Sequence, residues 1–150
     1  MTLLEHAADV RYPRLPMTDD EKRVKHLEMI QAVVTRMAQN SFAMKGWAVG
    51  IVAALLAFGA KDQNLRFAIL AILPCLVFWG LDGYYLALER RYRDLYDEVR
   101  TESGPVTFAM AVGATRRTWF GAVLAQSVCP FYLVVAGLAG VVALVGWRVG

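Results

Sequence analysis

Three apolar segments constrain the fold of this chain more than any other feature of its sequence. They cover residues 42–60, 65–87 and 121–147, and each is close to or above the roughly 20 helical residues that cross about 30 Å of hydrocarbon. With 57% of its 150 residues hydrophobic, the chain is too apolar for a soluble domain of this size. The sequence therefore predicts an all-α integral membrane protein with three transmembrane helices.

The basic residues are unevenly distributed between the two sides of these segments. Of the 16 Lys and Arg residues, three, Lys61, Arg66 and Arg148, lie on one side. The others lie before the first segment or at its start, or separate the second from the third: Arg11, Arg14, Lys22, Arg23, Lys25, Arg36, Lys45, Arg90, Arg91, Arg93, Arg100, Arg116 and Arg117. By the positive-inside rule, the N-terminus is predicted in the cytoplasm and the C-terminus outside.

The first two transmembrane helices are predicted to continue into the cytoplasm as an antiparallel hairpin. Residues 18–21, TDDE, form a capping box that starts a helix, and no breaker follows until Gly59. The second helix is expected to continue to residue 103. Because the connection at 61–64 is short, the two helices should pack antiparallel.

Each of these helices carries an apolar row with alternating steps of three and four residues, which is typical of a packed helical seam. If the turn centres near residues 62 and 63, residue i faces about residue 125 minus i, and the two rows coincide. The predicted seam comprises Leu27, Ile30, Val34, Met37, Leu81, Tyr85, Leu88, Tyr92, Leu95 and Val99.

The rest of the chain is assigned by its breakers and composition. Residues 1–17 are expected to be a mobile cytoplasmic tail, and 18–147 a single membrane domain. A helix at 105–118, after Gly104, is predicted to lie at the inner membrane face with Arg116 and Arg117 at lipid phosphates. Pro74 and Pro130 should kink the second and third transmembrane helices.

The hairpin register brings together a polar cluster at the inner edge of the membrane. Asp82 should lie opposite residue 43 and close to Lys45, with Asn40 and Ser41 at the same level. An unpaired charge at this depth costs several kcal/mol, so either Asp82 and Lys45 pair or each reaches water. A structural clamp and a carboxylate that lines an ion path both remain open.

Pairs of small residues four apart allow transmembrane helices to approach closely. Three pairs are candidates for helix packing, either within one chain or between the copies of a homo-oligomer: Gly50 with Ala54, Gly121 with Ala125, and Ala136 with Gly140.

The sequence offers no recognisable catalytic motif. It has no Gly-rich phosphate loop, nucleophile elbow or suitably spaced carboxylate pair, and we expect neither enzymatic activity nor a cofactor. His6 and His26 are too isolated to predict a metal site. The aromatic and arginine residues at 84–100 have mixed-sign neighbours, which disfavours nucleic acid as a partner.

Three stretches, RMAQNSFAMKGWAV, FWGLDGYYLALERRYRDLY and CPFY, resemble small prokaryotic membrane proteins with a long first helix and three spans. Some of these accompany antiviral defence genes. The resemblance covers about residues 20–135 and implies a place in the prokaryotic inner membrane, as an effector or as the membrane partner of another protein.

Two functions follow as hypotheses. The first is an oligomeric ion channel or membrane-perturbing effector, with a coiled-coil collar and the Asp82 cluster at its mouth. The alternative is a non-conducting membrane adaptor whose cytoplasmic hairpin docks a protein partner.

Overall fold

The computed structural model describes residues 16–62, 65–113 and 116–149. All regular secondary structure in these ranges is helical, which confirms the all-α prediction. There are four helices: α1 (Asp19–Asp62), α2 (Leu65–Thr101), α3 (Arg116–Val123) and α4 (Cys129–Val149). The predicted tail, apart from its last two residues, lies outside the described part of the chain.

The N-terminus of α1 is capped as the sequence predicts. The Thr18 hydroxyl accepts a hydrogen bond from the Glu21 amide at 3.2 Å, and the Glu21 carboxylate accepts one from the Thr18 amide at 2.7 Å. These reciprocal bonds satisfy two amides that a helix start would otherwise leave unpaired. A hydrogen bond from Lys22, together with its charge, lowers the pKa of Asp19 in the same turn.

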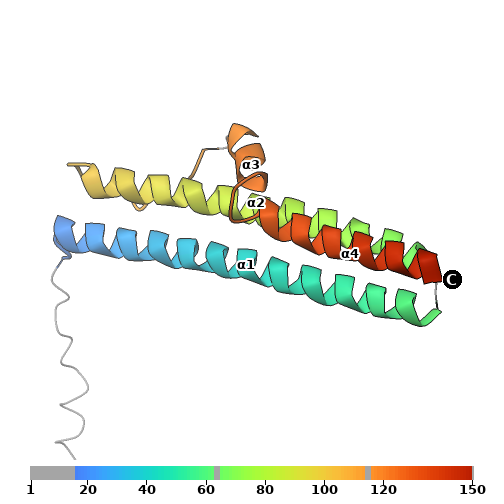
Figure 1. Ribbon diagram of the computed structural model, residues 1–150. Coiled ribbons are helices and arrows are strands. Elements are labelled where there is room, and N and C mark those ends of the chain that lie inside the picture. The colour runs from blue at the N-terminus through green and yellow to red at the C-terminus, as the bar shows by residue number, and fades with distance from the viewer. Residues whose placement is uncertain (1–15, 63–64, 114–115, 150) are drawn as a thin grey trace, which may run out of the picture.

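Helices α1 and α2 form the antiparallel hairpin, and α4 lies along one half of it (Figure 1). We call residues 42–62 and 65–81 the apolar half, and residues 19–41 and 82–101 the charged half. In the apolar half the buried core positions of α1 and α2 are Ala48, Val52, Ala71 and Cys75. The core of the charged half consists of Ile30, Val34 and Val99.

Most of the predicted seam lies inside the charged half. Ile30, Val34, Met37 and Val99 are buried, and Leu27, Tyr92 and Leu95 pack against the core they form. Tyr85 and Leu88 are half-buried. Leu81 is the exception, because it is exposed while the next residue, Asp82, turns toward α1.

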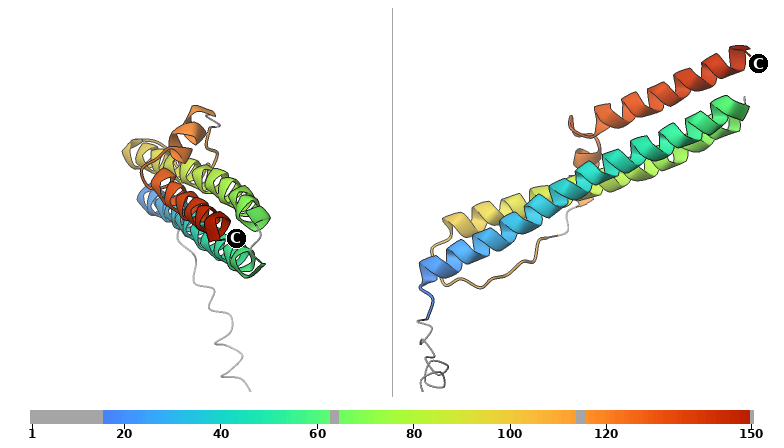
Figure 2. Two further views of the ribbon diagram at one scale, coloured as in Figure 1. Left: turned by 45° about the vertical axis from the view of Figure 1, so that its right-hand side comes forward. Right: turned by 90° about the horizontal axis from the view of Figure 1, so that it is seen from below.

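The helix predicted at 105–118 is wrong over residues 105–113, which form no helix. Together with Glu102, Ser103 and Gly104 they form what we call the strap (residues 102–113), which returns along the charged half (Figure 2). The reason is distance. The connection between Thr101 and Arg116 must run back along α2 to the level of Gly83, a distance of about 27 Å. Its 14 residues would cover only about 21 Å as a helix.

The third predicted span is divided. Helix α3 ends at Val123, consecutive turns occupy 124–128, and α4 begins at Cys129. Pro130 is therefore the second residue of α4, where its missing amide hydrogen has no helical partner to lose. The kink predicted at Pro130 is instead a helix start, while α2 continues through Pro74 as one helix.

Candidate functional site

A buried ion pair joins α1 to α2 where the two halves of the hairpin meet. Asp82 has none of its surface exposed. The Lys45 Nζ atom lies 2.5 Å from Asp82 Oδ2, and the Ser41 hydroxyl donates to Oδ1. Lys45 also donates to Ser41 Oγ at 3.1 Å. Asp82 therefore lies close to Lys45, as the register predicts, and of the two alternatives left open the charges pair, with Lys45 and Ser41 one turn apart on α1.

The fourth predicted member of this cluster takes no part in it. Asn40 is half-buried, but among the described residues no hydrogen bond joins it to Asp82, Lys45 or Ser41. It precedes Ser41, and adjacent residues on a helix do not face the same side. The cluster that the structure assembles is Asp82, Lys45 and Ser41.

Helix α4 brings Tyr132 against the same region. Its side chain is fully buried and lies nearly parallel to the indole of Trp79, with ring centroids 6.3 Å apart. The Tyr132 hydroxyl is buried and forms no hydrogen bond with any described residue. We therefore describe it as a buried, unpaired hydroxyl beside the ion pair.

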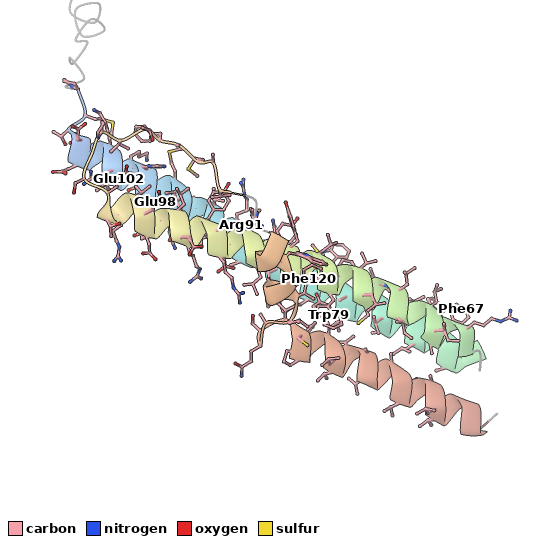
Figure 3. The ribbon with its side chains drawn as sticks, turned by 90° about the horizontal axis from the view of Figure 1, so that it is seen from above. Phe67, Trp79, Arg91, Glu98, Glu102 and Phe120 are labelled. Carbon is pink, nitrogen blue, oxygen red and sulfur yellow. The ribbon has the colours of Figure 1, made fainter. Side chains whose placement is uncertain are left out.

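Two tryptophans fasten α3 across α2 beside the ion pair, near Trp79 in Figure 3. The Trp79 indole donates to the Val123 carbonyl at 2.9 Å, and the Trp119 indole donates to the Gly80 carbonyl at 3.2 Å. Between these bonds a Cβ on Gly83 would lie 2.4 Å from Val123 Cγ2 and 3.0 Å from its Cα. Only glycine allows the two backbones to approach this closely.

These contacts enclose the Asp82 carboxylate, whereas the Lys45 side chain keeps 21% of its surface exposed. Taking a carboxylate and an ammonium out of water costs several kcal/mol per ion, which the ion pair and its hydrogen bonds must offset. Because Asp82 is enclosed and neutralised within one chain, the arrangement acts chemically as a charged clamp between helices.

The predicted helix-packing residues lie mostly on open faces. Gly50, Gly121 and Gly140 have no neighbouring atom within 4 Å of the position of a Cβ, and Ala54 is exposed. The exceptions are half-buried: Ala125 and Ala136, of which Ala136 packs on the core of the apolar half. Gly50, Ala54, Gly121 and Gly140 therefore make no close helix contact within one chain. Their packing between copies stays a prediction.

Arg116 and Arg117 form the first turn of α3. Their side chains lie outside the described residues, so their predicted contact with lipid phosphates stays a prediction.

The roles of three residues were not predicted from the sequence: two lie near the ion pair, and the third, His26, contacts the strap. Tyr132 belongs to the quoted CPFY stretch, but its burial depends on how α4 docks. Gly83 is one of 12 glycines, and its sequence context does not distinguish it. His26 is buried, and its ring Nε2–H donates to the Ala109 carbonyl at 3.0 Å.

No protein-family model matches this chain, and the searches of curated proteins and of solved structures gave no significant match. Two of its helices, over Asp19–Lys61 and Arg66–Thr101, contain windows long and apolar enough to cross a membrane. A shorter apolar stretch covers Cys129–Val145 in α4.

Proposed function

We propose that the chain is a membrane protein in which α1, α2 and α4 cross the prokaryotic inner membrane, with the N-terminus in the cytoplasm. The proposal is supported by the large apolar side chains exposed on these helices, which include Phe42, Trp47, Phe58, Ile69, Leu73, Leu76, Leu133, Leu138 and Leu144. Such a surface suits lipid and would aggregate in water.

The charged half has the opposite surface and would project into the cytoplasm. Its exposed side chains include Lys25, Glu28, Arg36, Arg90, Arg93, Asp94, Asp97, Glu98 and Arg100. The 20 helical residues of α2 from Asp82 to Thr101 extend about 30 Å. We propose that this projection docks a cytoplasmic protein, so that the chain works as a non-conducting membrane adaptor.

The observation that carries the adaptor proposal is the enclosure of Asp82. A carboxylate that lines an ion path must meet water or ions, whereas Asp82 is fully buried and bonded to Lys45 and Ser41 of its own chain. Its contacts suit the joining of helices better than conduction.

Cross-linking of the full chain in its native membrane, followed by purification, tests the adaptor proposal. We expect a cytoplasmic protein to be recovered, and Arg90→Glu on the exposed face of the charged half to reduce the yield at least fivefold. Lys61→Glu, at the opposite end of the hairpin, is the matched control and should leave the yield unchanged. Equal loss with both variants, or no partner, would reject the proposal.

A second candidate is a homo-oligomeric channel or membrane-perturbing effector. It is favoured by the open faces at Gly50, Gly137 and Gly140, where a second copy can approach without meeting a side chain of the same chain. Ion flux from liposomes that contain the purified protein tests it. A channel that uses Asp82 requires the flux to change with Asp82→Asn, and absence of flux from the wild type rejects it.

A further inference from the structure

The strap covers a groove of the charged half and is held there by few polar contacts. The Arg23 guanidinium donates to the Gly104 carbonyl at 3.2 Å, and His26 Nε2–H donates to the Ala109 carbonyl. Both bonds run from a side chain of α1 to the backbone of the strap. The side chains of Arg23 and His26 could donate in the same way to any extended segment whose carbonyl groups have this spacing.

The strap fills its groove incompletely. Met110 packs on the core formed by Ile30, Val34 and Val99, but a cavity of about 230 Å³ remains between the strap and the hairpin. Its walls include Arg23, His26, Leu95 and Val99. The strap therefore leaves part of this groove unfilled and open.

The strap also carries backbone strain. Phe108 has a φ of 52°. Among the described residues it is the one non-glycine residue with a positive φ. For a residue other than glycine this region is unfavourable. The Phe108 ring lies 5.6 Å from the ring of His26, so the strained residue is at one of the two attachment points.

The connection has enough length to leave the groove while both its ends stay in place. The 14 residues between Thr101 and Arg116 can reach about 46 Å when extended. The distance they must cover along α2 is only about 27 Å. Release of the strap therefore requires no movement of α3.

From these observations we infer that the groove is a docking surface for an extended, uncharged segment of a partner protein, and that the strap occupies it until such a partner binds. The partner segment has uncharged, mainly apolar side chains, as residues 104–111 have, and its carbonyls accept from Arg23 and His26. Glu98 and Glu102 also line the cavity and disfavour an acidic segment. The inference rests on the proposed adaptor function and names the surface that would perform it.

A labelled peptide with the strap sequence, SGPVTFAMAVG, serves as the probe, and the protein is the full chain in nanodiscs. In a strap-replaced variant, residues 104–111 are changed to alternating Gly and Ser, which leaves the groove open. We expect this variant to bind the peptide at least tenfold more tightly than the wild type. Arg23→Ala with His26→Ala in the same variant should remove most of that gain.

Three results would overturn the inference: equal binding by the wild type and the strap-replaced variant, equal binding after the Arg23 and His26 changes, or equally tight binding to empty nanodiscs. The last result would make lipid the receptor.

A second pair of variants keeps the strap and so avoids dependence on a large replacement. Phe108→Gly and Phe108→Ala both remove the ring, but only glycine relieves the strain at positive φ. In the Phe108→Gly variant the strap should stay in the groove more of the time, because its strain is relieved. This variant should therefore bind the peptide about fivefold more weakly than Phe108→Ala. Equal affinities would show that strain does not prepare the strap for release.

The outcomes separate this inference from the adaptor proposal. Peptide binding without recovery of any cytoplasmic partner would support the groove and reject the adaptor. A partner recovered equally from the wild type and the strap-replaced variant would support the adaptor and reject the groove.

Discussion

The two halves of the hairpin differ in which side chains they bury between α1 and α2 and which they expose. In the apolar half the buried positions are small, as at Ala48, Val52, Ala71 and Cys75, and large apolar side chains point outward. In the charged half the buried positions include Ile30, Val34, Met37 and Val99, and most charged side chains point outward.

The difference indicates what stabilises each half. In the proposed membrane arrangement the apolar half lies in lipid, where burial of apolar surface gives no advantage, so its helices would be held by close contact of small residues and by internal polar bonds. In water, burial of a large aliphatic side chain stabilises by about 1.5–3 kcal/mol. The ion pair of Asp82 and Lys45 lies at the boundary between the apolar half and the charged half.

The largest expected effect comes from breaking that ion pair. Lys45→Met leaves the Asp82 carboxylate buried without its cation, and we expect it to destabilise the protein by about 3–5 kcal/mol. Unfolding in mixed micelles with increasing SDS measures the change. Adding Asp82→Asn to Lys45→Met should recover part of the loss, and a double variant as unstable as the single one would contradict a charge-based clamp.

The next effect tests the charged half. Ile30 is fully buried, and Ile30→Ala should cost about 2–5 kcal/mol through lost burial and the resulting cavity. The matched change in the apolar half is Ile69→Ala at an exposed position, which should cost far less in the same assay. Comparable losses at both sites would remove the distinction between the halves.

A smaller effect is expected where α3 crosses α2. Gly83→Ala places a methyl group against the backbone of Val123 and should cost about 1–3 kcal/mol. It should also change the fluorescence of Trp79 and Trp119, whose indoles bond across this contact. Gly50→Ala, with open space around it, is the control, and an equal response there would count against the crossing.

The smallest expected effect is at the tip of the charged half. Thr18→Ala removes the side-chain oxygen that accepts from the Glu21 amide and should cost about 1 kcal/mol. Hydrogen exchange should speed up in the first turn of α1 and not at Val52. Unchanged exchange in that turn would show that the capping box does not contribute.

The hairpin could be predicted from sequence because its determinants are local. A short connection and two rows of regular spacing fix the register, and the register alone places Asp82 against Lys45. Leu81 was misassigned to the seam because an apolar residue beside a carboxylate is the obvious choice for burial, whereas here the paired carboxylate is buried.

The strap and the helix crossing could not be predicted because they depend on distances between remote parts of the chain. Residues 105–113 are apolar enough for a helix, and only the length of the return along α2 requires an extended chain. The role of Gly83 likewise depends on Val123, which lies 40 positions later in the sequence.

The ion pair also has a consequence for the order of events during synthesis. Lys45 precedes Asp82 by 37 residues, so the ribosome delivers the cation well before the anion that neutralises it. In the proposed membrane arrangement, α1 stays at the translocon or at the interface until α2 arrives. The two helices then partition into lipid together, which makes the hairpin, rather than the single helix, the unit of insertion.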